Sequence, residues 1–191
     1  MIQTQPDLKK ALKEWASVVA ALESGKQVIL LRKGGIMDPG FDVESPMFLL
    51  YPTRYHQSED QIRPQFQSIL GQARALQPAE GKIRISSLAQ VVDSKETTDI
   101  ETLKALSEKT IYTPQSLLDR YQNFRPKESI KILFVRTFLL GKPQICEERK
   151  SYLGCRSWVD LEDSIEIGSP RPVLSEDEFQ KARAEIRSIL K

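Results

Sequence analysis

The chain contains a single histidine, His56, and only two cysteines, Cys146 and Cys155. A structural zinc site needs four Cys or His ligands, so these three residues cannot complete one. A Ser-His-Asp type triad would have to use His56 as its base. The small number of Cys and His residues excludes a structural zinc site made by this chain alone. It also leaves His56 as the only histidine that could act in catalysis.

The chain also has little net charge, because 28 Lys and Arg against 26 Asp and Glu give a formal net charge of +2. Attraction to nucleic acid must therefore come from a local patch. Residues 1–7 contain neither a cationic n-region nor an apolar h-region, and no apolar run reaches the length of a membrane span. We expect a cytosolic protein with no membrane association, no cofactor and reduced thiols in place of a disulfide.

The remaining composition is that of a globular protein, with 40% hydrophobic and 28% charged residues. We expect a single domain over residues 1–191. Apolar spacings predict helices over 7–24, 61–76 and 98–106, after Thr113-Pro114, and after the capping box Ser175-x-x-Glu178. Continuous or alternating apolar runs predict strands over 28–31, 47–51, 83–92, 130–140, 145–146 and 158–161.

Several predicted strands are separated by short loops, which disfavours purely parallel pairing. The sequence therefore predicts an α+β fold with a mixed, partly antiparallel sheet and helices packed on it, and a barrel-like sheet is one form of this class. Residues 168–174 are expected to connect this body to the C-terminal helix.

The first candidate site is Arg32-Lys33-Gly34-Gly35, which follows the apolar run 28–31. Two cations beside flexible backbone can hold a phosphate or carboxylate. The spacing does not match a P-loop. The alternative interpretation is a strand end with solvated charges.

The second candidate site is the segment 51–57, Tyr-Pro-Thr-Arg-Tyr-His-Gln, which follows the buried strand 47–51. Its aromatic rings suit stacking on a base, while His56 and Gln57 suit contacts to polar edges. His56 also suits a general base near neutral pH. The alternative interpretation is an aromatic-rich turn that closes the core.

Two further candidates lie later in the chain. Arg136 interrupts the apolar strand 130–140 and must be paired or bind a ligand, and we expect a salt bridge to Glu14. Three cations between residues 149 and 158 alternate with Tyr152 and Trp158, a pattern that suits single-stranded nucleic acid. Within that segment we expect Cys155 to be buried in a tight turn.

The motifs Glu14-Trp15-Ala16, Leu-Arg-Lys-Gly-Gly-Ile over 31–36, Tyr-Pro-Thr-x-x-His-Gln over 51–57, and Gly-Cys-x-Ser-Trp-Val over 154–159 resemble a prokaryotic family known only as a domain of unknown function. That resemblance implies no activity. The opening segment, from Trp15-Ala16 to a strand ending in Arg32, is also similar to ASCH and PUA-like domains. Those are small mixed barrels, and the similarity implies binding of RNA or nucleotides.

The leading hypothesis is a protein that binds an anionic ligand, most plausibly nucleic acid or a nucleotide. We assign binding of the phosphate to Arg32, Lys33 and Arg156, and stacking on the base to Tyr51, Tyr55 and Trp158. Replacing Arg32 or Lys33 by Ala should weaken binding uniformly and reduce its salt dependence. The alternatives are a hydrolase or nuclease that uses His56, or Glu14 with a divalent metal, and an adaptor that docks a protein partner.

Overall fold

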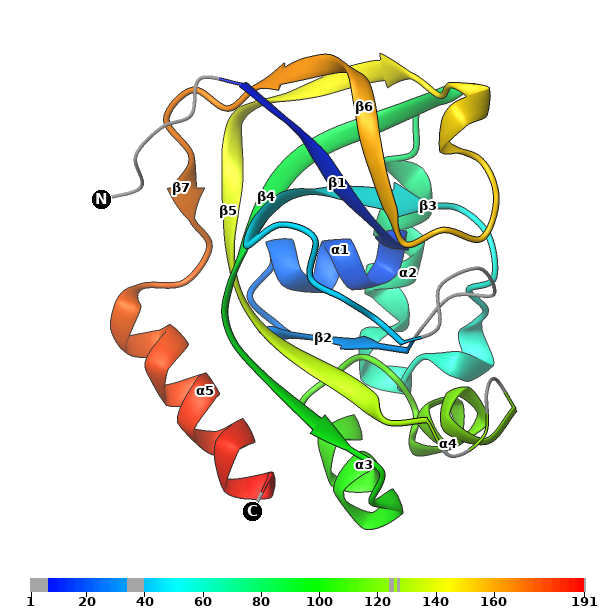
Figure 1. Cartoon of the computed structure of the whole chain (residues 1–191), viewed down its shortest axis with the longest axis vertical. Helices are drawn as coiled ribbons and strands as arrows, with labels where there is room; N and C mark the ends of the chain where they lie inside the picture. Colours follow the sequence, from blue (N-terminus) through cyan, green and yellow to red (C-terminus); the bar gives the residue numbers. More distant parts are fainter. Residues whose placement is uncertain (1–6, 34–39, 124–125, 127, 191) are drawn as a thin grey trace.

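The computed structural model describes residues 7–33, 40–123, 126 and 128–190. These residues form a seven-stranded sheet in the order β2-β5-β4-β3-β1-β6, with β7 beside β5 (Figure 1). The strands are β1 (Asp7–Trp15), β2 (Ile29–Arg32), β3 (Met47–Thr53), β4 (Lys82–Thr97), β5 (Ile130–Glu147), β6 (Trp158–Glu166) and β7 (Arg171–Pro172). The α-helices are α1 (Ala16–Glu23), α2 (Gln67–Ala75), α3 (Ile100–Ser107), α4 (Pro114–Asn123) and α5 (Glu176–Ile189).

The sheet is mixed, which confirms the predicted α+β class. β1 runs parallel to β3, whereas the other pairs are antiparallel. The sheet does not close into a barrel. Gln144 of β5 nevertheless contacts β6, the strand at one end of the sheet order. Gln144 Nε2 donates to the Glu166 carbonyl at 2.7 Å, and the Glu166 N–H donates to Gln144 Oε1 at 3.3 Å.

The predicted helix over residues 7–24 is wrong in its first half, because β1 occupies residues 7–15 and α1 begins only at Ala16. Leu8 and Leu12 are four residues apart, which suits a helix, but the register of β1 against β6 shifts between Leu8 and Lys10, and the two side chains enter different core clusters. β1 pairs with β3 on one side and β6 on the other. These non-local hydrogen bonds satisfy the backbone and override the local helical pattern.

Other boundaries also differ from the predictions. The strands expected over 130–140 and 145–146 are one continuous strand, β5, and Pro52 lies inside β3 although it was expected to end that strand. The helix expected from residue 61 begins at Gln67, after two short 3-10 turns (Glu59–Gln61 and Pro64–Phe66). The helix expected from residue 98 begins at Ile100 and is capped by Asp99, whose carboxylate accepts from the Thr102 N–H at 2.7 Å. The capping box at Ser175 is confirmed.

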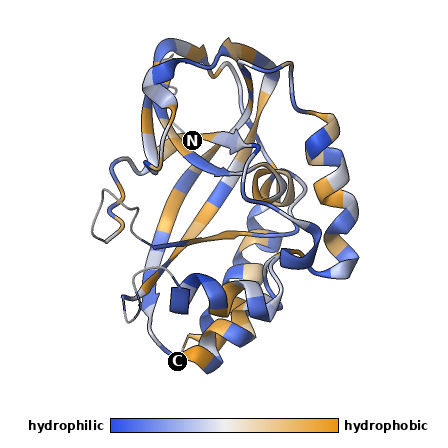
Figure 2. Ribbon diagram, turned by 90° about the vertical axis from the view of Figure 1, so that its right-hand side faces the viewer, coloured by the Kyte–Doolittle hydropathy of each residue, from blue (hydrophilic) through white to orange (hydrophobic). Residues whose placement is uncertain are grey.

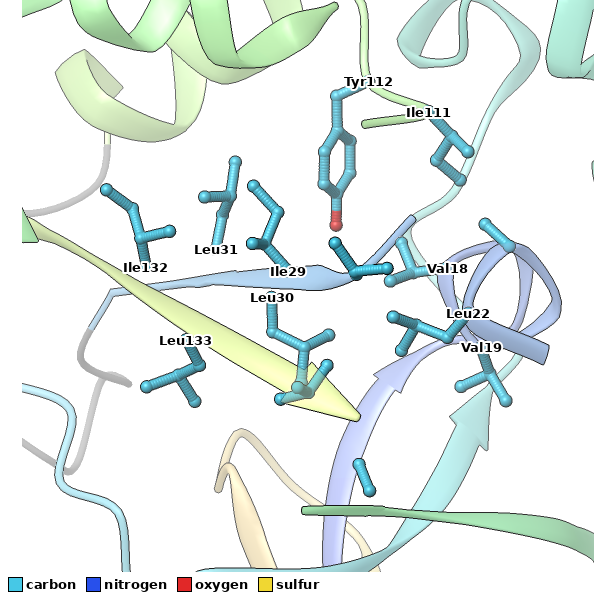
Figure 3. Close-up of a cluster of buried hydrophobic side chains, with 14 of the residues drawn as sticks. Val18, Val19, Leu22, Ile29, Leu30, Leu31, Ile111, Tyr112, Ile132 and Leu133 are labelled. Carbon is cyan, nitrogen blue, oxygen red and sulfur yellow. The ribbon is translucent and has the colours of Figure 1, made fainter. Parts of the chain in front are cut away.

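The core is divided between the two sides of the curved sheet. Along the long strands, apolar residues alternate with polar ones (Figure 2). One cluster joins α1 to β2 and β5, where Val18, Val19 and Leu22 lie close to Ile29 and Leu30 (Figure 3). A second cluster lies among β1, β3, β4, β5 and β6. β1 contributes Leu12 to the first cluster and Leu8 and Ala11 to the second, so this strand is held from both sides.

Helix α5 is attached to β4 and β5 by ion pairs as well as by buried Phe179 and Ile186. Arg136 forms its salt bridge with Glu176, so the expected pairing with Glu14 is wrong. The physical reason is that α5 covers the part of β5 that carries Arg136. On β4, the Asp93 carboxylate accepts from Arg183 at 3.3 Å and also from Arg187.

The Asp93 contacts predict a pH-dependent contribution to stability. The hydrogen bond from Arg187, together with that from Arg183, lowers the pKa of Asp93 below its ordinary value of 3.8. A lowered folded-state pKa stabilises the fold above the unfolded-state pKa, and this stabilisation is lost as the pH falls through the folded-state pKa. We expect Asp93→Asn to lower the free energy of unfolding by about 1–2 kcal/mol at neutral pH.

The check is denaturant unfolding of both proteins at neutral pH and again well below the pKa of Asp93. The difference between wild type and Asp93→Asn should shrink at acidic pH, because the wild-type carboxylate is then protonated. Glu101→Gln, which removes an exposed salt bridge to Lys104, is the control and should have little effect. A difference that stays constant with pH would contradict the assignment.

Candidate functional site

A pocket of about 360 Å³ lies where β1 and β3 end, between α4 and the turn at residues 153–156. Because β1 and β3 are parallel, their carboxyl ends meet at one edge of the sheet, where Trp15 is opposite Thr53. The described lining residues are Lys13, Glu14, Trp15, Arg32, Tyr51, Pro52, Thr53, Arg54, Tyr55, His56, Ile83, Arg120, Glu148, Leu153, Gly154, Cys155 and Arg156. The two predicted segments near Arg32 and Tyr51 therefore do meet.

Glu14 and Arg32 form a buried ion pair in this wall. The Arg32 Nη1 donates to Glu14 Oε2 at 3.0 Å, and the Trp15 N–H donates to Glu14 Oε1 at 2.8 Å. Arg32 Nη2 donates to the Ser157 hydroxyl at 2.9 Å, while Arg32 Nε is buried and has no hydrogen-bond partner among the residues that the structure describes. Both carboxylate oxygens of Glu14 are thus engaged, so this residue orients Arg32.

Arg120 of α4 packs against two aromatic rings. Its guanidinium carbon is 4.2 Å from the Trp15 ring centroid and 4.4 Å from that of Tyr112. The two rings are themselves in edge contact, with centroids 5.4 Å apart. Sequence reasoning missed Arg120, because it sits on an ordinary amphipathic helix and its aromatic partners come from other parts of the chain. No local signal could have identified it.

Lys13 holds the turn that carries Cys155 and Arg156. Its Nζ donates to the carbonyls of Tyr152 at 2.8 Å and Gly154 at 2.9 Å. Burial lowers the pKa of Lys13. Gly154 has φ of +91°, a conformation that favours glycine. The turn faces outward, so the expected burial of Cys155 is wrong: Cys155 and Arg156 are both exposed, and both cysteines are free thiols.

The segment after β3 supplies a wall and a rim. The Tyr51 hydroxyl donates to Glu148 Oε1 at 2.6 Å, and burial raises the pKa of this phenol. The Tyr51 ring is almost fully buried, whereas Tyr55 is 64% exposed at the rim. His56 is exposed beside it and has a φ of +65°, which is uncommon for a residue with a side chain.

Other predicted site residues are not brought to this pocket. Lys33 donates through Nζ to the Tyr121 carbonyl at 2.6 Å, and burial lowers its pKa. Gln57 accepts from the Ser17 N–H at 3.0 Å and donates to the Thr53 carbonyl at 2.9 Å, so it joins α1 to β3. Gly34 and Gly35 lie outside the described residues.

Arg136 lies against α5, as described above, and Trp158 lies in the core. Trp158 is 8% exposed, and its ring packs on Phe41 and Phe48 with centroids 5.8 Å and 5.0 Å away. Its Nε1 donates to the Asp42 carbonyl at 2.9 Å. Neither residue is among those that line the pocket.

Residues 7–33, 40–123, 126 and 128–190 contain neither a cluster of metal ligands nor a helix that could span a membrane. No group of three or more His, Cys, Asp or Glu side chains there is arranged to hold a metal ion. The helices of this part of the chain are all too short or too polar to cross a lipid bilayer.

The fold and the pocket define a mixed α+β protein with a cationic, ligand-sized pocket at the edge of an open sheet. The chain belongs to the family described as Domain of unknown function (DUF1802), which matches residues 11–185. This confirms the resemblance expected from the sequence motifs. No curated protein matches the chain.

Solved structures of ASCH from Zymomonas mobilis are similar to this chain. One is 14% identical, covers 92% of this chain and 93% of its own, and gives a TM-score of 0.48. A mutant of the same protein is 15% identical, with coverages of 94% and 98% and a TM-score of 0.48.

Proposed function

We propose that the pocket binds an anionic ligand of nucleotide chemistry, either a free nucleotide or single-stranded nucleic acid. The observation that carries this proposal is the charge of the pocket. Its described lining holds five cationic side chains, from Lys13, Arg32, Arg54, Arg120 and Arg156, but only two carboxylates, from Glu14 and Glu148. Such an excess in a concave site attracts anions.

The five cations differ in how far the protein itself uses them. Arg54 Nη2 donates to the carbonyls of Pro78, Ala79 and Lys82 at 2.6–3.0 Å, which ties two loops together. Lys13 and Arg32 are held by the contacts described above. Arg156, on the exposed turn, and Arg120, beside its two rings, are therefore best placed to contact a ligand.

Aromatic groups and pocket size favour a nucleotide over a simple anion. Tyr55 presents an exposed ring at the rim, and Trp15 lines the interior. Exposed aromatic rings beside cations are the usual means of holding unpaired bases. A volume of about 360 Å³ lies in the lower range of small-molecule pockets. We infer that nucleic acid would enter as a single strand, one nucleotide at a time.

The test is titration of labelled single-stranded RNA, single-stranded DNA and a nucleotide at low salt, after measuring the absorbance ratio at 260 and 280 nm for co-purified nucleic acid. Arg156→Ala should weaken binding by about tenfold and reduce the salt slope. Lys33→Ala is the matched control, because Lys33 does not line the pocket, and its affinity should be unchanged. The sequence alone predicted that Lys33→Ala would weaken binding, so this control replaces that expectation. Equal losses in both variants, or no binding of any probe, would overturn the proposal.

A further inference from the structure

Arg120 has the arrangement of a preorganised phosphate ligand. Its guanidinium carbon lies 4.2 Å from the Trp15 ring centroid and 4.4 Å from the Tyr112 ring centroid, so contacts with two rings restrict where the group can lie. A guanidinium that packs on aromatic rings can still donate hydrogen bonds from its edge. The edge is the part that matches two phosphate oxygens at once. Lysine has the same charge but cannot reproduce this planar fork.

Two other groups extend the anion-binding capacity of the same pocket. Arg156 lies on the exposed turn that Lys13 fixes in place. Arg32 is paired with Glu14 and lines the same pocket, so its guanidinium adds to the cationic wall.

The charge balance indicates which phosphate would fit. The described lining has an excess of three cationic groups over carboxylates. An internal phosphodiester carries one negative charge, whereas a phosphate monoester carries about 1.5 to 2 negative charges at neutral pH and has three free oxygens. A monoester can therefore engage the Arg120 fork and still present an oxygen to a second donor.

Building on the proposed function, we propose that the pocket selects a terminal phosphate monoester, with Arg120 as its bidentate ligand. The ligand is either a mononucleotide or the phosphorylated end of a single strand, since both present the same group. The base would lie toward Tyr55 at the rim. Glu148 lines the same pocket and would repel a second phosphate close to it.

The experiment compares matched probes that differ only in the phosphate. Adenosine 5′-monophosphate is compared with adenosine, and a 5′- or 3′-phosphorylated single-stranded oligonucleotide with its hydroxyl-ended form, by calorimetry or competition anisotropy. We expect the phosphate to raise affinity by at least about tenfold. Arg120→Lys should reduce this preference to about twofold, because affinity for the phosphorylated probe should fall more than affinity for the hydroxyl-ended one.

The outcomes separate this inference from the proposed function. Equal binding of phosphorylated and hydroxyl-ended strands would overturn the monoester inference while leaving anion binding intact. Binding of no probe would overturn both. Arg120→Gln is the second variant, and thermal unfolding of both variants reports on folding. If Arg120 only supported the Trp15 and Tyr112 rings, its variants would lose affinity for both probes equally, and that result would also overturn the inference.

Discussion

Glu14→Ala is expected to lower the free energy of unfolding by about 3–5 kcal/mol, because it leaves a buried guanidinium without its counter-charge. The side chain of Glu14 is 2% exposed and that of Arg32 is 13% exposed. The substitution also removes the acceptor for the Trp15 N–H, at the point where β1 becomes α1. Equilibrium denaturant unfolding measures the loss.

Three variants serve as controls for this result. Glu101→Ala breaks an exposed ion pair with Lys104 and should cost at most about 0.5 kcal/mol. Glu14→Gln retains hydrogen-bonding capacity, so its loss of unfolding free energy should lie between those of Glu14→Ala and Glu101→Ala. A paired Glu14→Leu, Arg32→Met protein removes both charges together and should recover much of the loss. If Glu14→Ala behaved like Glu101→Ala, the buried pair would be of no structural importance.

The same ion pair determines how binding data on Arg32 should be interpreted. Arg32 was predicted from sequence as a phosphate ligand, but its Nη1 bonds to Glu14 and its Nη2 to Ser157. Replacing it therefore perturbs folding and binding together. Arg156 and Arg120 are the cleaner probes, because neither takes part in the buried ion pair between Glu14 and Arg32.

The sequence predicted which segments meet at the candidate pocket better than it predicted which residues line that pocket. It indicated that Arg32 and the segment after Tyr51 follow buried strands, and the sheet does bring them to one edge. It did not indicate the parallel pairing of β1 with β3, because residues 7–15 have a spacing compatible with helix and strand alike. Without that pairing, the positions of Lys13, Glu14 and Trp15 in the pocket wall could not be predicted.

Long-range partners account for the other differences. Arg136 needed a counter-charge, and Glu176 reaches it only through the tertiary packing of α5 on β5, which the sequence does not show. Lys33 is adjacent to Arg32 but projects elsewhere, because successive side chains near a strand end alternate in direction. Arg120 acquires its position only from tertiary contact with Trp15 and Tyr112, which no local pattern encodes.

Trp158→Ala is expected to lower the free energy of unfolding by about 3–5 kcal/mol, because it opens a cavity between two packed rings. Phe41 stacks on the indole at 5.8 Å and Phe48 meets it edge-on at 5.0 Å. Trp158→Phe keeps most of the apolar contact and loses the hydrogen bond to the Asp42 carbonyl, so its cost should be smaller. Thermal or denaturant unfolding distinguishes the three proteins.

Replacing each tryptophan in turn distinguishes a tryptophan that packs in the core from one that contacts the ligand. The chain has two tryptophans, and only Trp15 is among the described residues that line the pocket. Ligand binding should therefore change the fluorescence of Trp158→Phe as it does in wild type, whereas Trp15→Phe should lose most of that change. The opposite pattern would restore Trp158 as the stacking residue and would move the site toward Phe41. Because both variants keep an aromatic ring, the comparison tests ligand contact and not folding alone.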